Sequence, residues 1–97
     1  MSHHTRWVRI EGDGVAYVGP CLVRAIIFWP DANGDYVDIY DGRDATSGKK
    51  FCRIESSAQI TWHFCFPDGV PFAKGVYVDG IDDAVETTIL LEPTEGM

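Results

Sequence analysis

Short apolar runs that alternate with polar residues follow one another along this chain, and clusters of Gly, Pro, Asn and Asp separate them. Alternation with a period of two places successive side chains on opposite faces of an extended strand, so it predicts half-buried β-strands. The predicted strands cover residues 7–11, 15–18, 21–29, 36–40, 49–54, 59–66, 70–72, 75–78 and 85–91. Eight or nine short strands without helical periodicity indicate an all-β fold, a single antiparallel β-sandwich or jelly-roll domain of about eight short strands.

The first two predicted strands are separated by Gly12-Asp13-Gly14. Asp-Gly between two apolar runs is a hairpin signal, because Gly adopts the positive φ that a tight turn needs. We therefore expect strands 7–11 and 15–18 to form a hairpin.

The clearest alternation in the chain lies in residues 59–66. One face of this predicted strand carries Ile60, Trp62, Phe64 and Phe66, and the other carries Gln59, Thr61, His63 and Cys65. Because the first face is wholly apolar, we expect it to belong to the core. Replacement of Trp62 by Ala is then expected to unfold the domain.

The run at residues 21–29 is the longest predicted strand and is apolar on both faces. Under strict alternation one face carries Leu22, Arg24, Ile26 and Phe28, and the other carries Val23, Ala25, Ile27 and Trp29. A strand of this kind is expected at the centre of a sheet, with the core on one side and an interface or a loop on the other.

Length and composition limit the chain to one small domain. We expect a β-sandwich over residues 6–92, a flexible N-terminus at 1–5 and a C-terminal tail at 93–97. Its 97 residues are 45% hydrophobic and 24% charged, which is typical of a globular protein. Eight basic residues against 15 acidic ones give a net charge of −7, which disfavours binding to nucleic acid.

Two groups of residues deserve testing as chemical sites. Asp31, Asn33 and Asp35 alternate as in a calcium loop, but the Gly and Glu that such a loop needs are replaced by Tyr36 and Gly42, and a turn explains them more simply. His63 and Cys65 share a strand face as two metal ligands or a Cys–His pair would. No further ligand, base or oxyanion hole is placed by the sequence, so we expect no enzyme, metal site or cofactor.

Three cysteines, Cys21, Cys52 and Cys65, cannot all pair within one chain. Free thiols in a reducing cytoplasm are the simpler interpretation, and one disulfide with a spare thiol is the alternative. The polar start of the chain is not that of a signal peptide, and the apolar runs are too short to span a bilayer. We expect a soluble protein made in the cytoplasm.

A series of short motifs runs from Gly19 to Leu91. These motifs are Gly19-Pro20 before the long strand, Ile-Tyr-Asp-Gly at 39–42, Ala-Thr-Ser-Gly at 45–48, Phe66-Pro67, Val70-Pro71-Phe72, and Lys-Gly-Val-Tyr-Val at 74–78. In this order they resemble a family of small β-sandwich virion structural proteins encoded by tailed bacteriophages. The cysteines and the acidic turn near Asp82 depart from that pattern.

The resemblance implies a non-enzymatic capsid decoration or cement protein. Such a protein would reach the virion from the host cytoplasm and bind the major capsid protein or another virion protein as a homo-oligomer, such as a trimer. Outward-facing aromatic side chains would anchor its contacts. The candidates for this role are Trp7, Trp29, Tyr36, Tyr40 and Tyr77. The alternative function is a carbohydrate- or receptor-binding module of a tail or head fibre, in which exposed aromatic rings stack on sugars.

Overall fold

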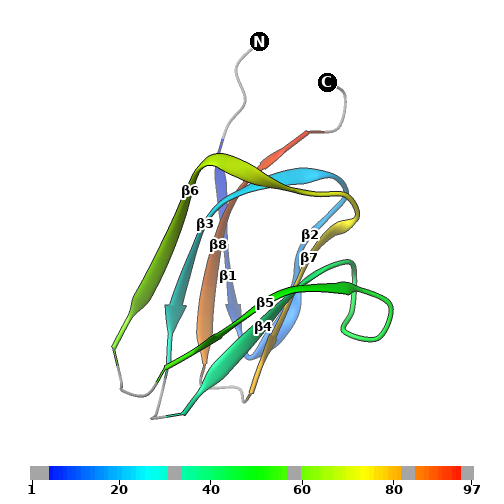
Figure 1. The fold of residues 1–97 in the computed structure, drawn as a ribbon. Coiled ribbons are helices and arrows are strands. Elements are labelled where there is room, and N and C mark those ends of the chain that lie inside the picture. The colour runs from blue at the N-terminus through cyan, green and yellow to red at the C-terminus, as the bar shows by residue number, and fades with distance from the viewer. Residues whose placement is uncertain (1–4, 31–33, 57–59, 82–84, 95–97) are drawn as a thin grey trace.

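The computed structural model describes residues 5–30, 34–56, 60–81 and 85–94, and these form an all-β fold. Figure 1 shows the strands as two facing layers. The strands are β1 (Arg6–Glu11), β2 (Asp13–Val18), β3 (Cys21–Trp29), β4 (Tyr36–Asp41), β5 (Lys49–Glu55), β6 (Trp62–Phe72), β7 (Gly75–Gly80) and β8 (Glu86–Pro93). The predicted all-β sandwich of about eight strands is confirmed.

Each layer is a four-stranded antiparallel sheet. Sheet A has the order β1-β8-β3-β6, and sheet B has the order β2-β7-β4-β5. Most strands that are consecutive in the chain, such as β1 and β2 or β7 and β8, therefore lie in opposite sheets. This exchange of strands between two four-stranded sheets defines a jelly roll.

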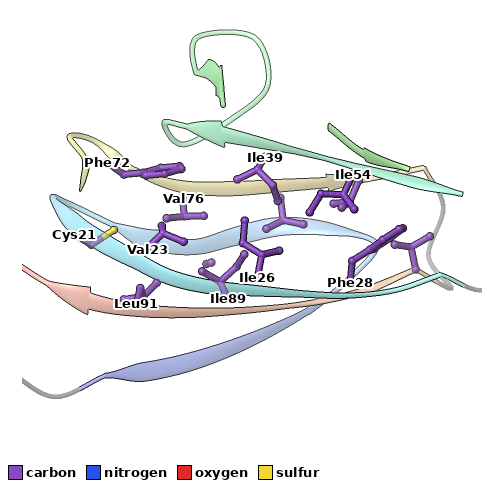
Figure 2. Packing of buried hydrophobic residues seen from close by; sticks show 14 residues of the cluster. Cys21, Val23, Ile26, Phe28, Ile39, Ile54, Phe72, Val76, Ile89 and Leu91 are labelled. Carbon is purple, nitrogen blue, oxygen red and sulfur yellow. The ribbon is translucent and has the colours of Figure 1, made fainter. Parts of the chain in front are cut away.

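The core fills the space between the sheets (Figure 2). Side chains that alternate along each strand point inward, which is why the period of two in the sequence predicts the strands. The core cluster takes Cys21, Val23, Ile26 and Phe28 from β3, Val37 and Ile39 from β4, Val76 and Val78 from β7, and Ile89 and Leu91 from β8, among others. Burial of each such aliphatic or aromatic side chain contributes about 1.5–3 kcal/mol.

The two faces of β3 differ from the prediction. The register with both neighbours shifts between Val23 and Ala25, which marks a β-bulge at Arg24. Val23 and Ile26 both point into the core, whereas strict alternation would place them on opposite faces. One extra residue in a strand reverses the alternation beyond it, and no pattern of apolar residues alone locates that point.

The expected hairpin of the first two strands is wrong. β1 pairs with β8 and β2 pairs with β7, so the chain crosses from sheet A to sheet B at Gly12. Gly12 has a φ of 72°, and its N–H donates to the carbonyl of Val85, while its own carbonyl accepts from Gly80 N–H. These bonds tie the two sheets together at one side of the sandwich.

β6 combines two predicted strands, 59–66 and 70–72, into one. Cys65 lies opposite Ala25 and Val70 lies opposite Val23, so residues 66–69 of β6 face a single extra residue of β3. Residues 67–69, which separate the two predicted strands, thus belong to an enlarged bulge within an edge strand. Ile60 precedes the strand, and Gln59 lies outside the described residues.

Candidate functional site

An apolar groove opens between β5 of sheet B and β6 of sheet A, on the side opposite the crossing at Gly12. In Figure 1 these two edge strands diverge at this side of the sandwich. The groove has a volume of about 400 Å³. It is lined by Ile26, Phe51, Cys52, Arg53, Ile54, Glu55, Trp62, Phe64 and Phe66, and we call it the edge groove.

The β6 wall of the edge groove consists of the aromatic face that the sequence assigned to the core. That prediction is wrong for three of the four residues, because Trp62 is 39% exposed, Phe64 is 40% exposed and Ile60 is 50% exposed. Phe66 is partly buried and packs against the core. Trp62 and Phe64 lie on the edge strand β6 and Ile60 precedes it, and no described strand closes the space between β6 and β5. Trp62 keeps its indole polar group satisfied, because Nε1 donates to Ser56 Oγ at 3.1 Å.

The β5 wall is built around Phe51. Its ring packs edge-on against Phe66, with centroids 6.1 Å apart, and against Phe72, with centroids 5.2 Å apart. These contacts link the end of the groove to the core and fix its shape, although Phe51 itself remains 39% exposed. Edge-to-face pairs of this kind contribute about 0.5–1.5 kcal/mol beyond the buried area.

The sequence did not single out the residues of the β5 wall. Phe51, Cys52 and Ile54 follow two lysines in a strand that shows only weak alternation. A usable signal was present elsewhere: residues 56–67 contain no Asp, Glu, Lys or Arg, in a chain that is 24% charged. Edge strands usually carry charged side chains that prevent pairing with another chain, so a long uncharged stretch at a sheet edge indicates a surface that can bind another protein.

The outer face of sheet B holds three of the five predicted interface residues. Tyr36 and Tyr40 lie on β4 and Tyr77 on β7, and all three are partly buried. Tyr40 and Tyr77 are opposite each other in the ladder, with ring centroids 6.2 Å apart. The Arg53 guanidinium lies over the Tyr36 ring at 4.0 Å from its centroid. The rings thus form a polar–aromatic face rather than an exposed apolar patch.

Asp38 lies at the centre of this outer face and is only 5% exposed. Arg53 donates to it through Nε at 2.7 Å and Nη2 at 3.0 Å, and Lys50 Nζ lies 3.3 Å away. The hydrogen bonds from Arg53 lower the pKa of Asp38, and Lys50 adds to the effect against the opposing influence of burial. Asp38 thus lies on the outer face of sheet B, and its ion pairs with Arg53 and Lys50 allow its burial there.

The two predicted tryptophans lie on the outer face of sheet A but are not brought together. Trp7 on β1 is 71% exposed and pairs with Leu90, whereas Trp29 on β3 pairs with Glu86, four residues along β8. The five predicted interface residues therefore fall on two opposite faces, and none of them lines the edge groove.

The residues considered for chemistry do not form a cluster of three or more possible ligands in the part of the chain that the structure describes. His63 and Cys65 are both exposed on β6. Asp31 and Asn33 lie outside the described residues, and Asp35 is buried. Within residues 5–30, 34–56, 60–81 and 85–94, no three His, Cys, Asp or Glu side chains gather as a metal site would require. In those same ranges no helix is long and apolar enough to cross a membrane.

All three cysteines are free. Burial raises the pKa of the Cys21 thiol to about 11, with a contribution from Asp41. Burial and Asp38 also raise the pKa of Cys52. Raised values keep both thiols protonated and weakly nucleophilic at neutral pH, which is the opposite of what a catalytic cysteine needs.

Comparison of the chain with protein-family models, with curated proteins and with solved structures found no match.

Proposed function

We propose that this chain is a non-enzymatic structural protein that joins a larger protein assembly as a homo-oligomer. The observation that carries the proposal is the edge groove, where aromatic side chains stay about two-fifths exposed beside an uncharged strand. Exposed apolar surface of this kind marks contacts between proteins. Cys21 and Cys52 have raised thiol pKa values, and Asp38 is held by Arg53, which favours an interaction role over catalysis for these groups.

A virion is the assembly that we propose. The order of short motifs between Gly19 and Leu91 resembles small virion structural proteins of tailed phages. The jelly roll is also a fold of viral capsid domains, although a fold alone does not determine a function. A decoration or cement protein bound to the major capsid protein, or to another virion protein, fits both features.

Co-sedimentation with shells tests this proposal. The shells are assembled from the purified major capsid protein of a tailed phage, and this protein is added at rising concentration. We expect saturable binding at a fixed ratio to the shell subunits. Phe64→Ser should weaken binding, whereas Val18→Ser, which changes an exposed residue at the opposite edge of sheet B, should not. Absence of saturable binding to shells and to assembled tails would contradict the proposal.

A carbohydrate-binding module is the second candidate, and the outer face of sheet B favours it. Tyr40 and Tyr77 lie there beside Asp38, Asp79 and Arg53, and aromatic rings beside carboxylates and guanidinium groups suit sugar faces and hydroxyls. A glycan screen tests this candidate. Binding that Tyr40→Ala abolishes would favour it, and a screen without hits beside positive shell binding would remove it.

A further inference from the structure

We infer that the first arm of β6, residues 62–65, pairs antiparallel with the same arm of a second copy of this chain. A two-fold axis perpendicular to the sheets would join the two copies of sheet A and place the two edge grooves face to face. This inference rests on the proposed function, because it specifies which surface forms the homo-oligomer. Three observations support a second copy of the chain as the partner that covers the edge groove.

The first observation is how the four sheet edges differ. Natural edge strands are protected from pairing by charged side chains, prolines and bulges. β1 carries Arg6, Arg9 and Glu11, β5 carries Lys49, Lys50, Arg53 and Glu55, and β2 carries Asp13 and a register shift after Val15.

β6 is protected along only part of its length. Its second part has Pro67, Asp68, Pro71 and the enlarged bulge. The first arm, residues 62–65, has the sequence Trp-His-Phe-Cys, with no proline, no acidic residue and no lysine or arginine. Among the described sheet edges, it is the one stretch of this length that pairs without a register shift and carries no charged residue. We therefore expect this stretch to pair with another strand.

The second observation is charge. Two copies that each carry a net charge of −7 repel one another over most of their surface. They approach at least cost where neither bears charge, and residues 56–67 are uncharged. An isologous contact must also be self-complementary, which an antiparallel strand edge satisfies through its own backbone groups.

The third observation is area. Large aromatic side chains present about 150–250 Å² each, so at two-fifths exposure Phe51, Trp62 and Phe64 leave about 60–100 Å² each uncovered. Two copies would thus bury about 400–600 Å² of aromatic surface, against at least about 1,200 Å² for a specific interface. The strand edges and flanking residues must supply the rest. The dimer should therefore depend on concentration rather than be permanent.

Strand geometry places Cys65 near its copy. Residues directly opposite in an antiparallel pair point to the same face, so a symmetric pair must be centred on a residue. The centres that keep Pro67 out of the pair are Phe64 and His63. Centring on Phe64 places the two Cys65 residues one diagonal step apart, about 7–8 Å, and centring on His63 places them about 14 Å apart. Both registers put the exposed Cys65 thiols within reach of a bis-maleimide with a long flexible spacer.

The test combines crosslinking with sedimentation velocity of the purified full chain from micromolar to millimolar concentration. We expect a shift from monomer to dimer and a crosslinked dimer that Cys65→Ser abolishes and Cys52→Ser retains. Phe64→Lys should raise the dissociation constant at least tenfold, and its matched control Val18→Lys should leave it unchanged. His63→Glu, which adds charge on the outer face without touching the groove, should also weaken the dimer.

The outcomes separate this inference from the proposed function. A monomer at every concentration, a trimer insensitive to the β6 substitutions, or crosslinks that persist in Cys65→Ser would overturn the second-copy contact. A monomer that still binds shells saturably would leave the proposed function standing, with a segment of the shell protein as the occupant of the groove. A Cys65-dependent dimer that binds no shell would support the contact between two copies and contradict the proposed virion function.

Discussion

At the scale of single residues, the three thiols lie in environments that should give them different reactivities. Cys21 is buried with a pKa raised to about 11, Cys52 is half-buried with a raised pKa, and Cys65 is exposed. Because the thiolate is the reactive form, we expect a maleimide or an aromatic disulfide at pH 7–8 to label Cys65 first and Cys21 only on unfolding. Mass spectrometry of labelled peptides over time measures the order. Rapid labelling of Cys21 in the native protein would contradict its placement in the core.

Asp38 should make stability depend on pH. Its pKa is lowered in the folded state, mainly by the hydrogen bonds from Arg53, so its contribution is present above the unfolded pKa and is lost as the pH falls through the folded pKa. Because Arg53 and Lys50 are partly exposed, we expect Asp38→Asn to cost about 1–2 kcal/mol at pH 7. The difference from wild type should narrow below about pH 4. Urea unfolding at both pH values measures this.

The control for that experiment is Asp68→Asn, which removes one negative charge at an exposed position. Its effect should stay within about 0.5 kcal/mol. An equal loss of stability in Asp38→Asn at neutral and acid pH would show that the side chain contributes through packing rather than through its charge.

Thr87 presents a buried polar group without a partner. It is fully buried on β8, and its Oγ1 finds no hydrogen-bond partner among the described residues. A buried hydroxyl left unsatisfied costs about 1–3 kcal/mol, and valine has nearly the same shape. We therefore expect Thr87→Val to raise the free energy of unfolding by about 1 kcal/mol. Destabilisation by this substitution would show that the hydroxyl does hold a hydrogen bond.

At the scale of elements, the difference between a central strand and an edge strand decides what an aromatic residue contributes. Phe28 on β3 is fully buried, so Phe28→Ala should cost about 3–5 kcal/mol, enough to unfold a small domain. Trp62 on β6 leaves two-fifths of its surface exposed, so Trp62→Ala should cost clearly less, about 1–2 kcal/mol. Thermal melts of the two variants test the ranking. A Trp62→Ala chain that is unfolded while Phe28→Ala melts like the parent would reverse the assignment of the core.

The same distinction explains what the sequence predicts well. Alternation locates β3, β4, β7 and β8 to within two residues, and the inward positions Val37, Ile39, Ile89 and Leu91 are all buried. Each of these strands pairs with a neighbour at both edges, so its inward side chains are fully covered. The local pattern of apolar residues therefore matches the observed burial. The all-β class follows from these strands.

The errors arise where pairing over long distances decides the structure. The bulge at Arg24 and the crossing at Gly12 depend on β6, β7 and β8, which lie far along the chain. The edge groove depends on which strands end up at the edges, and a periodic pattern carries no such information. Alternation therefore identifies the aromatic face of residues 60–66 as apolar but wrongly predicts that it lies in the core, and it does not identify Phe51 as part of an apolar surface.

At the scale of the whole molecule, the sandwich is asymmetric. One side is joined at Gly12, Val85 and Gly80 by backbone hydrogen bonds, and the opposite side leaves aromatic side chains uncovered between β5 and β6. In a jelly roll that is joined at one side and open at the other, a second protein molecule can cover the exposed apolar side chains of the open side. This arrangement is consistent with a subunit of an oligomer. Association in solution should therefore cover that open side.

Hydrogen–deuterium exchange of the β6 amides, measured in dilute and in concentrated protein, tests this most directly. Alternate amides of an edge strand point to solvent and exchange rapidly unless another strand pairs with them. We expect exchange in peptides covering residues 60–66 to slow markedly as the protein concentration rises, while exchange in peptides covering β1 and β2 does not change. Association without protection of β6, or with protection at β1 and β2 instead, would contradict it.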